Sequence, residues 1–314
     1  MNGIHVQRSR RSLPPMSTLK AFEAAVRLGT FKAAAEELGL TQSAISHQIK
    51  SLEMHFQTAL FVRQGNQVVP TADGTVYGAS VVKVFSELSR AGETLLTKGQ
   101  KEIVRVSASP AFAAFAALPN IERFKLSNAA LDLRLEARNT RVDFDTEVID
   151  AAIEVGSPPF RGLQAHRLFR SKLAPLAHRT LCEKYAPVKT ASDLANMPLI
   201  ELNNIPGLWE RWFAKADRKA RVPPLNLSSD SLLAAIQMAE SGVGVLLAPF
   251  PLVASATASG RLQALFRPSL LIERPDFYLV YRKADATTDK IKAIRRWLKE
   301  VIAELEDATN TNDL

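Results

Sequence analysis

The spacing of apolar residues changes near residue 100, and this change constrains the fold of the 314-residue chain more than any other feature. Before it, apolar residues recur at helical intervals, interrupted by one short extended stretch. From Ile103 onward, short apolar strands alternate with helical segments, which predicts βα units and a parallel sheet. We therefore expect a largely helical head and a larger α/β domain, with the boundary in the polar stretch Lys98–Lys101.

Three short helices are predicted in the head. The first ends at Gly29, and Thr30 can cap a second helix over residues 31–38. A tight turn at Gly39 follows, and Thr41 can cap the third helix. Two short helices joined by a turn that contains glycine form a helix-turn-helix pattern.

The third helix has one apolar stripe and an opposite face that is poor in acidic residues. At about 100° per residue, Ile45, Ile49 and Leu52 fall on the stripe. Small hydroxyls, an amide and an imidazole on the other face permit close approach to a major groove and can hydrogen-bond base edges. The alternative is an ordinary exposed face of an amphipathic helix. The candidate DNA contacts on this face are Gln42, Ser43, Ser46, His47 and Lys50.

A small hairpin, or wing, is predicted after the third helix. The tripeptide Gln64-Gly65-Asn66 has turn chemistry and separates two short extended runs. Arg63 lies at the base of this hairpin, where it can reach a phosphate or a minor groove. The alternative for Arg63 is an ordinary surface arginine.

A long helix follows the wing, and its apolar residues recur at alternating steps of four and three. This heptad spacing predicts a coiled-coil dimer. A dimer would place two DNA-reading heads about a two-fold axis. The alternative is a helix that packs on its own domain. The predicted dimerisation seam consists of Tyr77, Val81, Val84, Leu88, Ala91 and Leu95.

The larger domain begins with a strand–helix–strand–helix–strand pattern. A helix runs to about Leu126, an alternating strand spans 131–137, a helix is predicted near Phe144–Val148, and a third strand ends at Gly156. In doubly wound sheets of this kind, ligands bind at the carboxyl ends of the strands. A helix start there favours an anion, although ordinary caps and loop residues explain the same positions. The candidate effector contacts in this part are Ser109, Phe112, Asn139 and Thr140.

Composition excludes several classes of protein. Cys182 is the one cysteine, so no intrachain disulfide forms, and the histidines show no metal-ligand spacing. Gly242-Val243-Gly244 precedes a strand, the reverse of a dinucleotide fingerprint. We expect no metal, no cofactor and no catalytic site. The net charge of +8, half of it in the first 102 residues, is compatible with nucleic-acid binding. Without a targeting or membrane-spanning segment, a cytoplasmic location with no membrane partner is expected.

The chain resembles the LysR-type transcriptional regulators. The motifs that carry the resemblance lie in the head: the block LKAFEAAVRLGTFKAAAEELGLTQSAISHQIKSLE, the LF-x-R of the wing and the T-x-x-G that follows. The family pattern extends over roughly residues 15–300. His47-Gln48-Ile49 is similar to the subgroup typified by the glycine-cleavage activator and the β-lactamase activator. Where this family often has Leu-Gly, the chain has Phe56-Gln57, which predicts a different C-cap and wing angle.

The resemblance implies a fold and a set of roles. The expected fold is α/β with an all-α N-terminal head: a winged helix-turn-helix, a long linker helix, then a two-lobed α/β domain like a periplasmic binding protein. DNA contacts are implied for the five candidates of the third helix and for Arg63. Asn203 and Asp230 are implied on the cleft side of the second lobe, although Asp230 can instead cap the helix that follows it.

The implied layout has five parts. The chain is expected to cross between lobes near Lys172–Leu176 and to return near Leu262–Phe266. The parts are a basic tail (1–14), the winged helix-turn-helix (15–73), the linker helix (74–100), the effector domain (101–303; lobe I 103–174 and 265–303, lobe II 175–264) and a tail (304–314).

The expected function is sequence-specific, effector-modulated regulation of transcription. The implied partners are double-stranded promoter DNA, a small-molecule effector for which an anion is one option, and a second copy of the chain. A tetramer and contact with RNA polymerase are left open. Two alternatives remain from the residues alone: a solute-binding protein, and an enzyme with a fused regulatory head.

Overall fold

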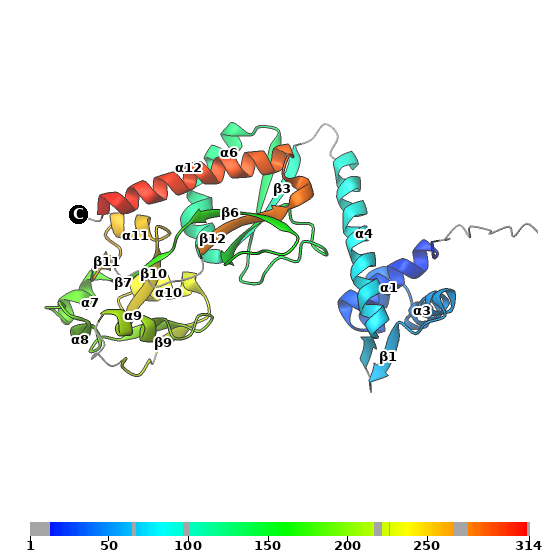
Figure 1. Cartoon of the computed structure of the whole chain (residues 1–314), viewed down its shortest axis with the longest axis horizontal. Helices are drawn as coiled ribbons and strands as arrows, with labels where there is room; N and C mark the ends of the chain where they lie inside the picture. Colours follow the sequence, from blue (N-terminus) through cyan, green and yellow to red (C-terminus); the bar gives the residue numbers. More distant parts are fainter. Residues whose placement is uncertain are drawn as a thin grey trace, which may run out of the picture. The chain divides into compact units, whose positions relative to one another are not determined.

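The structure is a computed structural model that describes residues 13–64, 67–96, 101–216, 222–225, 227–266 and 276–312 (Figure 1). Nearly all of the expected basic tail, 1–14, lies outside these residues. The described chain forms two compact units, and the first of them consists of the head up to Leu96 together with Asp145–Glu147. The expectation of a head and a larger α/β domain is therefore confirmed.

The head contains the three predicted helices, with the predicted caps. They are α1 (Met16–Leu28), α2 (Phe31–Leu38) and α3 (Gln42–Phe56). The Thr30 hydroxyl accepts a hydrogen bond from the Ala33 N–H, and the Thr41 hydroxyl accepts one from the Ala44 N–H. These contacts satisfy amide groups that a helix start otherwise leaves unpaired.

One apolar core holds the head together. Ile45, Ile49 and Leu52 of α3 are buried in it, together with Phe22 of α1 and Phe31 of α2. The wing closes one side of this core, because the Phe61 ring packs edge-on against both Phe22 and Phe31. The buried stripe of α3 is thus the one predicted from its periodicity.

The wing and the long helix follow in the predicted order. The antiparallel strands β1 (Phe61–Gln64) and β2 (Gln67–Pro70) form the wing, and α4 spans Ala72–Leu96. Thr71 caps α4, since its hydroxyl accepts a hydrogen bond from the Gly74 N–H at 2.9 Å.

The first lobe of the larger unit has a mixed five-stranded sheet in the order β4-β3-β5-β12-β6. β3 runs parallel to β4 and β5, whereas β12 is antiparallel to β5 and β6. The parallel arrangement expected for the three predicted strands is therefore confirmed, and β6 and the returning β12 add an antiparallel side that was not predicted. The bounds are β3 Glu102–Ala108, β4 Leu131–Ala137, β5 Ala151–Gly156, β6 Leu163–Phe169 and β12 Asp276–Arg282.

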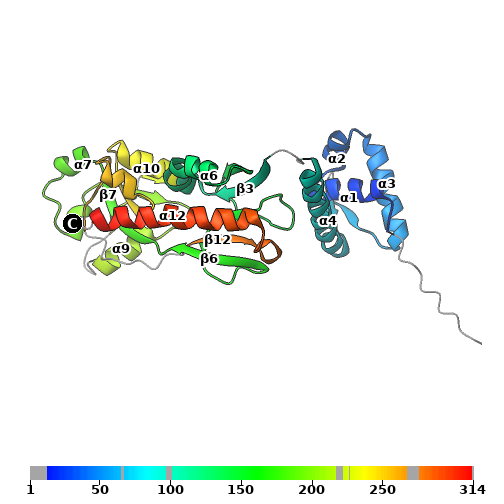
Figure 2. The ribbon, with the colours of Figure 1, turned by 90° about the horizontal axis from the view of Figure 1, so that it is seen from above.

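Helices cover this sheet. The first helical run changes type around Pro119: α5 (Pro110–Phe112) passes into a π-helical turn (Ala113–Ala117), a 3₁₀ turn (Leu118–Asn120) and α6 (Ile121–Ser127). The long α12 (Asp289–Asn312) packs against α6 of the first lobe and α11 (Ala254–Ala258) of the second (Figure 2). Since α12 reaches Asn312, the expected tail 304–314 is corrected: its residues are helical up to that point.

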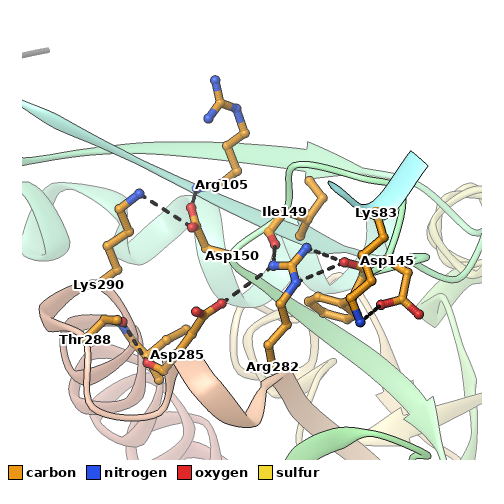
Figure 3. Close-up of polar contacts among 11 residues, drawn as sticks. Lys83, Arg105, Asp145, Ile149, Asp150, Arg282, Asp285, Thr288 and Lys290 are labelled. Carbon is orange, nitrogen blue, oxygen red and sulfur yellow. Dashed lines mark hydrogen bonds and ion pairs between the residues drawn. The ribbon is translucent and has the colours of Figure 1, made fainter. Parts of the chain in front are cut away.

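The helix expected near Phe144–Val148 is absent, and a turn stands in its place. The Arg282 guanidinium holds the turn by donating to the Phe144 and Ile149 carbonyls and by pairing with Asp285 (Figure 3). The Phe144 and Ile149 side chains are buried in a small core on this face of the sheet. An arginine from a distant strand thus takes the Phe144 carbonyl, which would accept the first hydrogen bond of the expected helix.

Next to it, the carboxylate of Asp150 also joins separate elements. It accepts a hydrogen bond from the Arg105 N–H at 2.7 Å and forms an ion pair with Lys290 of α12 at 3.5 Å (Figure 3). The start of β5 is thereby fixed to β3 and to the C-terminal helix.

The second lobe has the sheet order β11-β7-β10-β8-β9. β7 begins at Lys172 and belongs wholly to this sheet, so the expected lobe boundary at 174/175 falls inside a strand. The strands are β7 Lys172–Ala177, β8 Leu199–Leu202, β9 Leu227–Ser229, β10 Val245–Phe250 and β11 Gln263–Ala264; the remaining helices are α7 Arg179–Lys184, α8 Ala191–Leu194, α9 Leu208–Ala216 and α10 Leu232–Glu240.

Apolar contacts join the two lobes. Phe115 and Leu232 each pack against both lobe cores, and α10 of the second lobe contacts α5 of the first. Within the described part of the chain, no helix combines the length and apolarity that crossing a membrane requires.

The end of α3 contains a backbone conformation that suits glycine. Gln57 has φ 52° and ψ 34°, and it is the one non-glycine residue with positive φ among those the structure describes. It occupies the C-cap position where the sequence departs from the Leu-Gly pattern, so the turn that leads to β1 begins at a strained residue.

We predict that Gln57→Gly stabilises the protein by about 1 kcal/mol, because glycine adopts this conformation without strain. Thermal or urea unfolding followed by circular dichroism measures the change. The matched control is Gln48→Gly inside the same helix, which should destabilise by a similar amount. An equal loss of stability in both variants would contradict the assignment of strain to Gln57.

Candidate nucleic-acid interface

One face of α3 presents the predicted polar residues to solvent. Gln42, Ser43, His47 and Lys50 are exposed and Ser46 is half-buried, whereas Ile45 and Leu52 on the opposite side are fully buried. The hydroxyls of Thr41 and Ser43 lie 2.9 Å apart at the start of the helix. The five candidates of the third helix therefore share one surface.

This surface continues into an open groove. The groove runs along the C-terminal half of α3, where His47, Lys50 and Met54 line it, and ends at the turn of residues 57–59. Met54 is 71% exposed and lies one helical turn beyond Lys50. Met54 was not among the predicted contacts, although its spacing from Lys50 places it on the same face.

The acid on α3 is held by the backbone of the wing. Glu53 is half-buried, and its Oε1 accepts hydrogen bonds from the Leu60 N–H at 2.8 Å and the Phe61 N–H at 3.2 Å. The exposed face of α3 between Gln42 and Lys50 carries no carboxylate of its own. Such a surface fits a polyanion better than a cation.

Arg63 is placed only through its backbone. It lies in β1 opposite Val68, in the hairpin that the sequence predicted. Its side chain lies outside the described part of the structure, as do Gly65 and Asn66 of the turn.

The predicted dimerisation seam divides into two parts. Tyr77 and Val81 pack into the core of the head, where the Tyr77 ring lies 4.8 Å from that of Phe56. Val84 and Leu88 are 51% and 55% exposed, and Ala91 is exposed as well. The side chain of Leu95 is not among those described. The alternative of a helix that packs on its own domain therefore applies to Tyr77 and Val81, whereas the dimerisation seam stays a prediction for Val84, Leu88 and Ala91.

The candidate effector contacts follow the carboxyl ends of parallel strands. Ser109 follows β3, Asn139 and Thr140 follow β4, Asn203 follows β8, and Asp230 follows β9. Ser109 precedes α5 in one lobe and Asp230 lies two residues before α10 in the other, and these two helices contact each other.

Several of these residues also have structural contacts. The Ser109 hydroxyl accepts from the Phe112 N–H at 3.3 Å, and Phe112 is buried in the core beside Phe277. Asn203 donates to the Ser228 hydroxyl at 3.3 Å. Asp230 is exposed, and the cap of α10 is Ser231.

Sequence reasoning missed a charged cluster beside Asn139. The Arg138 Nε donates to the Ser107 hydroxyl at 3.1 Å, and Glu154 accepts from the Val142 N–H at 3.3 Å. Burial raises the pKa of the Glu154 carboxyl. The position of Arg138 directly after a strand was the available signal, but Glu154 approaches it only through the pairing of β3 with β5.

The two units match two family descriptions. Residues 16–75 match "Bacterial regulatory helix-turn-helix protein, lysR family" and residues 97–303 match "LysR substrate binding domain". The glycine cleavage system transcriptional activator of Escherichia coli K12 is 32% identical over 301 residues, with 94% of this chain and 97% of that protein covered. The activator AmpR of Rhodobacter capsulatus is 32% identical over 291 residues, with 92% and 98% covered.

Solved structures agree with this fold. ArgP of Mycobacterium tuberculosis aligns with a TM-score of 0.63 at 22% identity, covering 93% of this chain and 98% of that one. The effector domain of AmpR from Pseudomonas aeruginosa aligns with a TM-score of 0.55 at 28% identity, covering 67% and 98%.

These comparisons decide among the three classes left open by the residues. The named relatives are transcriptional activators, and the matches take in both the helix-turn-helix head and the two-lobed domain. The alternatives of a solute-binding protein and an enzyme are therefore set aside, and the chain belongs to the LysR family of bacterial transcriptional regulators.

Proposed function

We propose that the chain regulates transcription by reading promoter DNA with the exposed face of α3. Gln42, Ser43 and Ser46 lie nearest the start of the helix, where they can approach base edges in a major groove. Lys50 supplies a positive charge for a phosphate, and His47 lies beside it. The single observation that carries this proposal is the exposed face of α3, which has no carboxylate between Gln42 and Lys50 and lies opposite a buried stripe.

The wing supplies a second point of contact in this proposal. Arg63 on β1 would meet a phosphate or the adjacent minor groove, and a guanidinium suits either. A regulator of this kind acts on chromosomal DNA, so the proposed location is the cytoplasm.

The chain is proposed to dimerise through the outer stripe of α4. Val84, Leu88 and Ala91 are exposed there at heptad spacing, while Tyr77 and Val81 hold the helix to its own head. A pair of heads would then read two half-sites about one helical turn apart. Pairing of two such dimers, and contact with RNA polymerase, are further steps that this proposal allows.

A small-molecule effector is proposed to bind between the two lobes. The supporting observation is that Ser109 and Asp230, from different lobes, precede two helices that pack together. Asn139 and Thr140 follow β4 in the first lobe and Asn203 follows β8 in the second, and together with the buried Phe112 they complete the candidate set. The effector must bind two states of the protein unequally in order to change transcription.

The proposed parts of the chain keep the expected bounds except that lobe II begins at Lys172 and α12 continues to Asn312.

We predict that Ser43→Glu abolishes specific DNA binding, because it places a carboxylate against phosphates and base acceptors. Gel retardation with a duplex selected by the wild-type chain from a randomised pool measures the effect. The matched control is Ser255→Glu on α11, an exposed helical serine outside the head, which should bind normally. Unchanged affinity of the Ser43 variant would show that this face does not meet DNA.

We predict that Lys50→Ala weakens binding to all sequences alike. The negative slope of log affinity against log salt should become shallower by about 1, because one phosphate contact is lost. Lys20→Ala on α1 removes the same charge from outside α3 and should leave the slope unchanged. A loss confined to one base position would instead assign Lys50 to base reading.

We predict that Val84→Asp combined with Leu88→Asp yields monomers with weak operator binding, since two carboxylates cannot be buried at a coiled-coil seam. Analytical ultracentrifugation reports the oligomeric state. Thr75→Asp with Ala79→Asp adds the same charge to another exposed face of α4 and should leave dimers intact. Intact dimers in both variants would rule out the outer stripe as the interface.

A further inference from the structure

The carboxylate of Glu53 connects the recognition helix to the wing. Glu53 lies near the end of α3, yet its Oε1 binds backbone groups seven and eight residues further on. It accepts from the Leu60 N–H at 2.8 Å and from the Phe61 N–H at 3.2 Å. Phe61 is the first residue of β1. One oxygen of α3 therefore holds the first amide of the wing and the amide before it.

The same point of the chain is fixed from the other side by the start of α4. The Thr71 N–H donates to the Leu60 carbonyl at 2.9 Å, and the Thr71 hydroxyl donates to the Ala59 carbonyl, also at 2.9 Å. Gly74 approaches so closely that an added Cβ would lie 2.0 Å from the Leu60 oxygen. Leu60 is 2% exposed, with Glu53 bound to its N–H, Thr71 bound to its carbonyl and Gly74 packed against that carbonyl.

A direct contact with DNA does not explain why an acidic residue, Glu53, lies near the end of α3. A carboxylate beside a phosphate backbone is repelled by it. An ordinary surface acid does not explain the residue either, since Glu53 is half-buried and its oxygen is shared by two amides. Hydrogen bonds to a charged acceptor are among the stronger ones in proteins. The contact geometry instead gives Glu53 a role in setting the direction of β1.

We propose that Glu53 is a positioning residue that sets the angle of the wing relative to α3, so that both elements meet the same stretch of duplex. The inference rests on the proposed DNA-binding function of α3 and the wing. Gln57 sharpens the need for such a tether, because the turn between helix and wing begins at a strained cap that glycine would relax. Without the carboxylate, the wing is joined to α3 only through this turn and the core.

For a substitution of Glu53, the proposal predicts a change in DNA affinity opposite in sign to the change that charge alone predicts. Removing a negative charge from a helix that faces DNA should strengthen binding, because repulsion by the phosphates falls. If Glu53 positions the wing, Glu53→Ala instead weakens binding, by about tenfold, because the wing no longer meets the duplex together with α3. Glu53→Gln keeps an acceptor oxygen at the same place and should restore the wild-type pattern.

The experiment uses the full chain and the duplex that the wild-type protein selects from a randomised pool. Affinity is measured by fluorescence anisotropy, and hydroxyl-radical footprinting maps the protected sugars. Circular dichroism first establishes that each variant is folded at the assay temperature. The control is Glu36→Ala on α2, which removes the same charge from an exposed position of the head away from the wing.

The expected result has three parts. Glu53→Ala loses the flanking protection due to the wing but keeps the protection at the centre of each half-site, Glu53→Gln keeps both, and Glu36→Ala binds as tightly as wild type or more tightly. Equal or tighter binding by folded Glu53→Ala with an unchanged footprint would overturn the proposal. Failure of the wild-type chain to select any duplex would instead refute the proposed DNA-binding function.

Discussion

The burial of one apolar stripe of α3 is the interaction on which the rest of the head depends. Ile45, Ile49 and Leu52 fit a core made with Phe22 and Phe31, and each fully buried aliphatic chain contributes about 1.5–3 kcal/mol. These contacts fix the rotation of α3 about its own axis. Because the rotation is fixed, the opposite polar face points to solvent, and the proposed DNA contacts follow from the core rather than from the surface residues themselves.

Local chemistry explains which elements could be predicted from the sequence. Thr30 and Thr41 cap the helices that they were expected to cap, since a cap depends on residues within three positions. Features that depend on distant residues were missed. The turn at residues 144–149 replaces a predicted helix because Arg282, far along the chain, takes its carbonyls. The antiparallel side of the first sheet arises in the same way, from the late return of β12.

The candidate site divides along the same line. The exposed residues of α3 could be selected from periodicity, whereas the tether from Glu53 to Leu60 requires a turn whose path no pattern specifies. The heptad spacing of α4 could be predicted from the sequence, but which of its apolar residues pack on the head and which stay exposed could not. Tyr77 and Val81 face the head because Phe56 and Phe22 lie beside them, and this leaves Val84 and Leu88 for a second copy in the proposed dimer. In the larger domain, the Arg138–Ser107 contact depends on the pairing of two strands.

Dimethyl sulfate protection tests the central claim most directly, because this reagent methylates guanine N7 in the major groove. The wild-type chain is bound to the duplex that it selects, and the methylated positions are compared with those of free DNA. The account predicts two protected patches of guanines about one helical turn apart, centred on the half-sites. Retardation of the duplex with no change at any guanine N7 in a guanine-containing half-site would contradict the placement of α3 in the major groove.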